Sequence, residues 1–507
     1  MALSLATTPS ADLSNFEKYH YMHARRLCPK SHRLCSKSRR LSKTKQISLL
    51  VHPKHLSNTM GKFMQLLTHP EEIKHVIQLL YFRQPVYPQD LQTSAATLQR
   101  CYYLLKQTSR SFAAVIQELH PELRNAVMVF YLVLRALDTV EDDMTLDPSV
   151  KIPMLREFDQ KLNTKDWTFN GSGPNEADRI VLVEFDNILS EYHKLKPQYQ
   201  DIVKEITFKM GNGMADYILD DNFNTNGVET IKDYDLYCHY VAGLVGEGLT
   251  KLMVLAKFSD NSLADDGFKK SDSMGLFLQK TNIIRDYHED LEDGRSFWPK
   301  EIWSKYTESL PSFHEDKSPK SQELGLNCIN ELVLNSMSHV KDVLEYLSLV
   351  KDPSSFNFCA IPQVMAIATL ATVYNNPKVL HQNVKLRKGT TCGLILQSRT
   401  FPGVVSIFRH YAQVINHKSS VQDPNYLKIG IKCAEIEKFC ELMYPTPGAI
   451  PKGVNRNQHA INEVIGSREK IDQSVQRRID QENFNTNVVF GGVFLVLIGM
   501  VLAIFST

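Results

Sequence analysis

Apolar residues recur at intervals of three and four over residues 91–444. This spacing is typical of one face of an α-helix, and the alternation expected of half-buried strands is nearly absent. Two long runs are prominent, Glu122–Asp142, which directly follows Pro121, and Ser271–Asp293. Proline is tolerated as a first helical residue, so we expect the first run to begin at Pro121. The pattern predicts an all-α protein in which residues 60–444 form one large helical domain.

Both ends of the chain differ from this helical part. Residues 1–59 carry eleven Lys and Arg against two acidic residues. We expect a basic, disordered extension there, although a transit-like peptide or an extension ahead of the true start at Met60 has a similar composition. Prolines and glycines from Pro445 onward indicate a break, and residues 445–487 are predicted to be a polar linker.

Residues 488–505 contain no charged side chain. As a helix, this run would span roughly 27 Å, about the thickness of the hydrocarbon core of an endoplasmic reticulum bilayer. We expect a transmembrane tail anchor, and a buried core helix is the alternative. Arg477 and Arg478 precede the run. Since basic residues favour the cytoplasmic side, we expect a single-pass protein of the endoplasmic reticulum whose folded domain faces the cytosol.

Charge and cysteine usage narrow the classes of function. The net charge is only +2, with +9 on residues 1–59 and therefore −7 on the rest, so the folded part is not expected to bind nucleic acid. Nine cysteines occur without a CxxC pair, which argues against zinc ribbons and a disulfide framework and fits a reducing compartment. Glycine-rich nucleotide loops and the GxSxG and HExxH patterns are absent.

Each long run carries a cluster of acidic residues. The first is Asp138–Asp142 and the second Asp286–Asp290. Residues three and four apart share a helix face, so each run projects at least two carboxylates from one side. Carboxylates crowded against apolar surface lose hydration and repel one another unless a cation compensates them. Mg²⁺ prefers oxygen ligands and is often shared between one or two carboxylates and substrate phosphates. The pair of clusters therefore predicts one diphosphate site between two facing helices.

Further polar residues extend these two faces. Tyr131 and Arg135 precede Asp138 and Asp142 on the first stripe, with Glu141 beside them. On the second stripe, which we expect to continue to Asp293, the polar residues are Gln279, Asn282, Asp286 and Asp290. A solvated, salt-bridged surface stripe, with Arg135 bound to Asp138, is the alternative for the first helix, and a solvated face is the alternative for the second.

Three other segments could contact phosphates or protons. Ser109, Arg110 and Ser111 at a helix start could hold a phosphate, although an N-cap role explains Ser109 equally well. Tyr237 lies before small residues that allow a neighbouring helix or a ligand to approach closely, and a lone tyrosine is more often a core residue. The basic residues 385–388 could bind an anionic cofactor, with a solvated loop as the default.

Together these motifs resemble those of the squalene synthases. The resemblance rests on LDTVEDDM at 137–144, NIIRDYHED at 282–290, SRSF at 109–112, YCHYVAGLVG at 237–246, RSFWP at 295–299 and FNFCAIPQ at 356–363. It covers roughly residues 60–447 together with the C-terminal apolar run. It implies a single helical domain of the isoprenoid-synthase type, which acts as a monomeric catalytic unit.

The resemblance also implies a two-step reaction. Two molecules of farnesyl diphosphate condense head to head to presqualene diphosphate, which is then rearranged and reduced to squalene, the first committed step of sterol biosynthesis. Mg²⁺ and NADPH are the implied cofactors. Apolar walls would exclude the water that quenches carbocations.

The residues that match the family motifs take the following implied roles. Metal ligands are Asp138, Glu141, Asp142, Asp286 and Asp290. NADPH contacts are Arg110, Arg135, Arg285, Lys385 and Arg387. Catalytic residues are Tyr237, which matches a tyrosine assigned to proton transfer, Phe358, which matches a cation-stabilising aromatic position, and Tyr131. Substrate contacts are Ser109, Ser111, Phe112, Gln279 and Asn282.

Three other classes of protein share part of this pattern. A phytoene or dehydrosqualene synthase has similar acidic motifs but makes no reductive step and needs neither the Lys385–Arg387 element nor an anchor. A non-catalytic membrane-anchored scaffold is expected to have lost a motif carboxylate, and none is missing. A class I terpene cyclase would not carry the SRSF and YCHY segments.

Overall fold

The computed structural model describes residues 69–219, 227–292, 295–444 and 470–492. In these ranges the protein is helical, and the one β-type contact is an isolated bridge between Ser259 and Val350. The expected all-α class is confirmed. Residues 1–59 of the expected extension and residues 493–505 of the expected anchor lie outside the described ranges.

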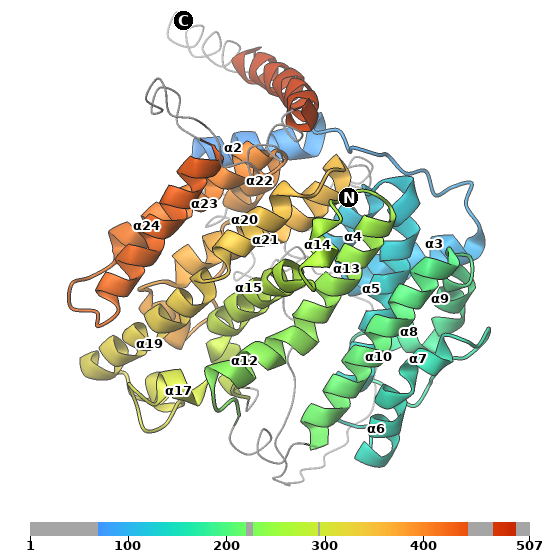
Figure 1. The fold of residues 1–507 in the computed structure, drawn as a ribbon, viewed down its shortest axis with the longest axis horizontal. Coiled ribbons are helices and arrows are strands. Elements are labelled where there is room, and N and C mark those ends of the chain that lie inside the picture. Colours follow the sequence, from blue (N-terminus) through green and yellow to red (C-terminus); the bar gives the residue numbers. More distant parts are fainter. Residues whose placement is uncertain (1–68, 220–226, 293–294, 445–469, 493–507) are drawn as a thin grey trace, which may run out of the picture.

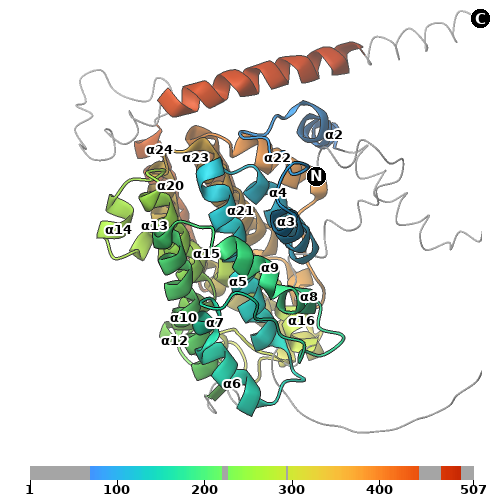
Figure 2. The ribbon, with the colours of Figure 1, turned by 90° about the vertical axis from the view of Figure 1, so that its right-hand side faces the viewer.

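The helices form one bundle around a continuous apolar core (Figures 1 and 2). The first part of the bundle comprises α2 (Pro70–Ile77), η3 (Gln78–Phe82), α3 (Ala96–Thr108), α4 (Arg110–Gln117), α5 (Pro121–Asp142), α6 (Pro148–Arg156), α7 (Phe158–Lys161), α8 (Arg179–Val183), α9 (Phe185–Tyr192) and α10 (Pro197–Leu219). The middle part comprises α12 (Ile231–Cys238), η4 (His239–Gly243), α13 (Leu244–Leu255), α14 (Ser262–Asp265), α15 (Lys269–Arg285) and α16 (Tyr287–Glu292). The last part comprises α17 (Lys300–Trp303), α18 (Ser312–Glu315), α19 (Pro319–Met337), α20 (Val340–Ser348), α21 (Pro353–Val373), η5 (Pro377–Leu380), α22 (Lys388–Gln397), α23 (Phe401–Lys418) and α24 (Tyr426–Met443).

Prolines begin several of the longest helices. Pro121, Pro197, Pro319 and Pro353 are the first residues of α5, α10, α19 and α21. The first helical N–H groups have no partner inside the helix, so proline loses nothing at this position and supplies the required φ. The start expected at Pro121 is confirmed.

Close backbone packing places α15 against the turn that follows α12. The η4 segment is a π-helical turn, and it packs on α15. A Cβ atom on Gly275 would come within 2.6 Å of the Ala242 carbonyl oxygen and 2.7 Å of the Gly243 nitrogen. Only glycine therefore fits at this crossing. The small residues after Tyr237 were expected to let either a neighbouring helix or a ligand approach closely. In the structure, helix α15 makes this close approach.

Helix α21 crosses the centre of the bundle. Among the described residues, it is the helix long and apolar enough to cross a membrane, but 78% of its most apolar stretch is buried in the protein. It packs on α15 and α23 and carries Phe358. Burial against these helices makes α21 a core helix.

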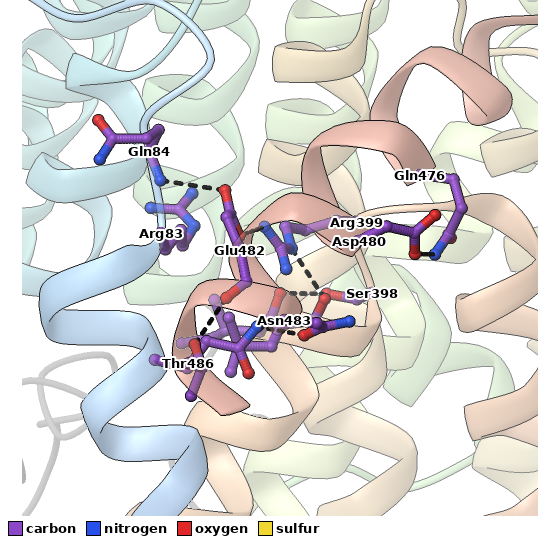
Figure 3. Close-up of polar contacts among 12 residues, drawn as sticks. Arg83, Gln84, Ser398, Arg399, Gln476, Asp480, Glu482, Asn483 and Thr486 are labelled. Atoms are coloured by element: carbon purple, nitrogen blue, oxygen red, sulfur yellow. Dashed lines mark hydrogen bonds and ion pairs between the residues drawn. The ribbon is translucent and has the colours of Figure 1, made fainter. Parts of the chain in front are cut away.

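The last described helix, residues 470–492, lies across the bundle (Figure 2). Sequence patterning placed residues up to 487 in a polar linker, but the helix continues through that boundary. The reason is that its polar residues have buried partners. Glu482 and Arg399 form an ion pair of 2.5 Å with side chains only 8% and 7% exposed (Figure 3). Glu482 also accepts the backbone N–H of Gln84, and Asn483 accepts a hydrogen bond from Gln78.

Replacing Glu482 with alanine is expected to destabilise the protein. The change leaves the Arg399 guanidinium buried without its carboxylate, which typically costs about 3–5 kcal/mol. Chemical denaturation of the full chain in detergent measures the free energy of unfolding. Glu435→Ala is the matched control, since Glu435 pairs with Lys432 at 2.7 Å but is 58% exposed. Equal losses in the two variants would contradict a contribution specific to the buried pair.

Candidate active site

The first acidic cluster occupies the C-terminal end of α5, where the helix is buried on nearly all sides. Arg135 and Asp138 are 8% and 7% exposed, so the expected alternative of a solvated surface stripe is wrong. Arg135 donates a hydrogen bond to the Tyr131 hydroxyl at 2.9 Å. Its other terminal nitrogen lies 3.7 Å from a carboxylate oxygen of Asp178. The middle of the stripe, Arg135 and Asp138, is therefore interior, whereas Tyr131, Glu141 and Asp142 are partly exposed.

Burial makes ionisation costly at this end of α5. It raises the pKa of Asp138 to about 7, an effect that the Arg135 charge opposes and that Glu141 and Asp178 reinforce. Burial likewise raises the pKa of Asp178 to about 6, again against the Arg135 charge. Several carboxylates thus share the field of one guanidinium. Additional positive charge would stabilise these carboxylates. Because their ligand atoms are all oxygens, they suit a hard divalent cation.

Sequence reasoning missed Asp178. This residue directly precedes α8, in a loop that begins near Gly173. Asp143, the residue after α5, holds that loop by accepting the Gly173 N–H at 2.8 Å and the Thr145 N–H at 2.8 Å. In the sequence, Asp178 looks like an ordinary residue ahead of a helix. Only the fold brings it against Arg135.

The second acidic cluster begins where α15 ends. Residues 271–293 were expected to form one continuous helix, but Asp286 has φ −94° and ψ 10° and separates α15 from α16. The Asp290 N–H still donates to the Asp286 carbonyl at 2.9 Å, so the break is a local distortion that keeps the two residues in register. Arg285 forms an ion pair with Asp286 at 2.6 Å, and Arg295 lies 3.3 Å from Asp290. Asp293 is outside the described residues.

Tyr237 lies between the two clusters. Its ring stacks on Phe297 with centroids 5.2 Å apart and meets Tyr217 edge-on at 5.6 Å. Burial raises the pKa of Tyr237, Glu141 and Asp290 raise it further, and Arg295 opposes the shift. Since Glu141 belongs to the first cluster and Asp290 to the second, carboxyl groups of both clusters lie close enough to act electrostatically on the same phenol. The structure therefore brings the two acidic motifs to one site.

An aromatic wall continues the site toward α4 and α21. The ring of Phe112 lies 5.9 Å from that of Tyr131 and 6.2 Å from that of Phe358. Ser109 accepts the Phe112 N–H at 3.4 Å, so the N-cap role expected as an alternative for Ser109 is the one in the structure. The side chains of Arg110 and Ser111 are outside the described residues. The wall presents an apolar surface beside the charged end.

Gln279 and Asn282 lie on α15, the helix that packs against α12 and α21. Gln279 is buried and Asn282 is partly buried. They thus occupy the helix that leads into the second acidic cluster, as the spacing predicted.

The basic segment before α22 is engaged elsewhere. Arg387 is half exposed and forms an ion pair with Glu72 of α2 at 2.8 Å, and Glu72 also accepts a hydrogen bond from Thr390. Lys385 is exposed. The structure therefore places Arg387 against α2, apart from the contacts that surround Tyr237.

Within the described ranges, no three His, Cys, Asp or Glu side chains converge closely enough to hold a metal ion by themselves. Mg²⁺ is usually held by one or two carboxylates and by substrate phosphates, without a cage made wholly of protein groups. The buried carboxyl groups at the end of α5 and the carboxylates of the second cluster supply that kind of partial ligand set.

Comparison with known proteins places this site in a family. The sequence model of the squalene/phytoene synthase family matches residues 105–390, more than half of the chain. The squalene synthase of Candida albicans is 69% identical over 87% of this chain and 99% of its own length. That of Saccharomyces cerevisiae is 54% identical over 87% of this chain and 98% of its own. The solved structure of TcSQS in complex with the ligand E5700 is 43% identical, has a TM-score of 0.64, and covers 68% of this chain and 98% of its own.

The chain belongs to the squalene/phytoene synthase family, whose members in this comparison are transferases of isoprenoid biosynthesis. Within that family it falls among the squalene synthases.

Replacing Asp138 with asparagine is expected to change how stability depends on pH. Asp138 has a folded pKa of about 7, above the value of about 3.9 in an unfolded chain, so its ionisation costs folding free energy as the pH rises between these values. In EDTA, the variant should gain stability relative to the natural protein from pH 4 to pH 7, with no further gain above.

Thermal unfolding across this pH range measures the difference. Asp147→Asn is the control, because Asp147 is exposed and its hydrogen bonds from Ser149 lower its pKa. A difference between Asp138→Asn and the natural protein that stays flat with pH would show that the Asp138 carboxyl ionises as easily in the folded chain as in the unfolded one.

Proposed function

We propose that this protein makes squalene from two molecules of farnesyl diphosphate. The first step joins them head to head to presqualene diphosphate, and the second rearranges and reduces that intermediate. The main support is the position of Tyr237, which lies within electrostatic reach of Glu141 in one acidic motif and of Asp290 in the other and stacks on Phe297. A phenol at this point can exchange a proton with a substrate whose diphosphates face both motifs.

We propose that the acidic residues hold Mg²⁺ through Asp138, Glu141, Asp142, Asp286 and Asp290. When bound, the metal supplies Lewis-acid neutralisation of the diphosphate leaving group. Arg285 and Arg295 already lie in contact with carboxylates of the second cluster and can orient phosphate oxygens beside them. The raised pKa of Asp138 supports this role, because added positive charge at the end of α5 would offset the cost of ionising this buried carboxyl group.

The apolar side of the site is proposed to protect the carbocations. Phe112, Tyr131 and Phe358 supply ring faces that stabilise positive charge and exclude water. The Arg135 guanidinium holds the Tyr131 hydroxyl and keeps this ring in place. Ser109 and Ser111 begin the helix that carries Phe112, and Gln279 and Asn282 face the substrate from α15.

NADPH is proposed as the reductant, held by Arg110, Arg135, Arg285, Lys385 and Arg387. Guanidinium groups suit the bidentate binding of phosphate. Since Arg387 is paired with Glu72, cofactor binding at this residue requires a phosphate to replace the carboxylate. A phytoene or dehydrosqualene synthase would form its product without this step.

We also propose the cellular setting. The apolar run at 488–505 anchors the protein in the endoplasmic reticulum membrane by one pass, with the catalytic domain in the cytosol as a monomer. Residues 60–444 are the catalytic domain, and residues 1–59 are a dispensable extension. An anchored enzyme releases its apolar product directly beside the bilayer.

The decisive experiment incubates the full chain in detergent with farnesyl diphosphate and Mg²⁺, with and without NADPH. Mass spectrometry identifies the products. We expect squalene only with NADPH and accumulation of presqualene diphosphate without it. A C30 or C40 polyene whose yield ignores NADPH would instead assign the chain to the carotenoid-type synthases.

Asp138→Asn and Asp286→Asn are each expected to abolish both steps. Each change removes a proposed metal ligand, and losing one charged transition-state contact typically costs roughly a hundredfold or more in rate. The measurement is presqualene diphosphate and squalene formed per enzyme, with Asp147→Asn at an exposed helix cap as control. Normal presqualene diphosphate formation by either variant would rule out a shared metal site.

Lys385→Ala combined with Arg387→Ala is expected to weaken only the reductive step. The double change removes two cationic phosphate contacts, and the KM for NADPH should rise roughly tenfold or more. Formation of presqualene diphosphate without NADPH should be unchanged. Lys378→Ala, at an exposed position of η5, is the control. An unaltered NADPH dependence in the double variant refutes the cofactor assignment for this segment.

A further inference from the structure

A lysine is buried in the interior outside the catalytic contacts described above. Lys280 of α15 is 1% exposed, although the side chain carries a full charge. Its ammonium group lies 2.5 Å from a carboxylate oxygen of Asp235 on α12. It donates hydrogen bonds to the Asn335 side-chain oxygen at 2.8 Å and to His339 Nε2 at 3.0 Å. The ammonium group thus has one ion-pair partner on α12 and two hydrogen-bond acceptors, one on α19 and one at the start of α20.

The hydrogen bonds beyond Lys280 have a fixed direction. A lysine can only donate, so His339 Nε2 accepts and the ring carries its proton on Nδ1. That proton is donated to Ser273 Oγ at 2.7 Å, and the Ser273 hydroxyl donates in turn to Asp342 at 2.8 Å. Burial and the Lys280 charge lower the pKa of His339 to about 3, which keeps the ring neutral. The hydrogen bonds from Lys280 through His339 and Ser273 to Asp342 therefore all run in one direction.

The contacts of Lys280 join α12 to α15, α19 and the start of α20. Asp235 is two residues from Tyr237 on the same eight-residue helix. Lys280 also lies 5.4 Å from the centre of the Tyr234 ring, one turn before Tyr237. On the other side, α15 continues to Asp286 and the second acidic cluster. Figure 1 shows α12 beside α15, and α19 and α20 also pack on α15.

The energetic cost of this arrangement indicates what it does. Only the lysine of the Lys280–Asp235 pair is buried, since the Asp235 side chain is 42% exposed. Burying the ammonium group costs desolvation energy, so the clearest benefit of the pair is to specify one packing arrangement. Here the specified arrangement is the position of α12 relative to α15. A shift of about 1 Å in a catalytic group can cost on the order of a hundredfold in rate.

We propose that Lys280 is a positioning residue, which holds α12 on α15 through Asp235 and so fixes Tyr237 between the two acidic motifs. The inference rests on the proposed role of Tyr237 in the first step. Lys280 itself touches no reacting group.

A double-mutant cycle tests the proposal on the full chain in detergent. Lys280→Met, Tyr237→Phe and the double variant are compared in the rate of presqualene diphosphate formation without NADPH. We expect Lys280→Met to lower kcat by about ten- to a hundredfold with little change in KM. In the Tyr237→Phe background the same change should lower kcat less than about threefold, because residues that act through one group are not additive.

Lys270→Met is the matched control. Lys270 lies on the same helix and pairs with Asp266 at 2.9 Å, a residue of the segment just before α15. Its replacement should leave kcat unchanged in either background. If Lys280→Met does not fold, Asp235→Asn takes its place in the cycle, because Asp235 is 42% exposed on its side chain and asparagine keeps its shape and an oxygen that can face the Lys280 ammonium.

A structural readout does not depend on residual activity. With 3-fluorotyrosine at position 237, the ¹⁹F resonance should shift or broaden in Lys280→Met and stay unchanged in Lys270→Met. Full additivity in the cycle, or an unchanged resonance, would overturn the positioning role. A Tyr237→Phe variant with full activity would instead overturn the proposed role of Tyr237, and with it the inference.

Discussion

The cost of burying ionisable groups is the constraint on which this structure depends. At the end of α5, Asp138 and Asp178 share one guanidinium, Arg135, inside an apolar bundle. Burial removes water from both carboxyl groups and raises their pKa values, yet the fold keeps them in the interior. Seven of the described helices, α3, α4, α6, α8, α9, α10 and α13, pack around α5 and hold it in place. Cohesion of the core thus holds charges in place that would separate in water.

Two kinds of compensation occur in the same bundle. Lys280 has its partners built into the protein, and the ammonium group is matched by Asp235, Asn335 and His339. At the first acidic cluster a single guanidinium, that of Arg135, faces two buried carboxyl groups, Asp138 and Asp178, whereas Arg285 and Arg295 are each paired with one acid of the second cluster. The first arrangement is self-sufficient, and the second can accept further positive charge. The distinction separates groups that hold the bundle together from groups that can bind a ligand.

Much of the fold could be predicted from periodicity, because helix starts and buried faces are local properties. Pro121 and the spacing of residues 122–142 predicted α5, and the small residues after Tyr237 predicted a close crossing. The break at Asp286 could not be predicted, since the residues around it continue the helical spacing. Asp178 and Glu72 were missed because their importance comes from partners 43 and 315 residues away in the sequence. Linear spacing carries no signal for such pairs.

The docking of residues 470–492 changes where the catalytic body ends. Glu482 fills a polar position between Arg399 and the segment after η3, so one side chain of the last described helix joins the segments that follow η3 and α22. A soluble form of the protein cut at the proline-rich break after residue 444 would lose this helix and expose the Arg399 region to water. A cut beyond residue 492 would retain it. Because the proposed anchor begins at residue 488, inside this helix, a truncated enzyme that keeps the Glu482 contacts but not the anchor should end between Asn483 and Val488.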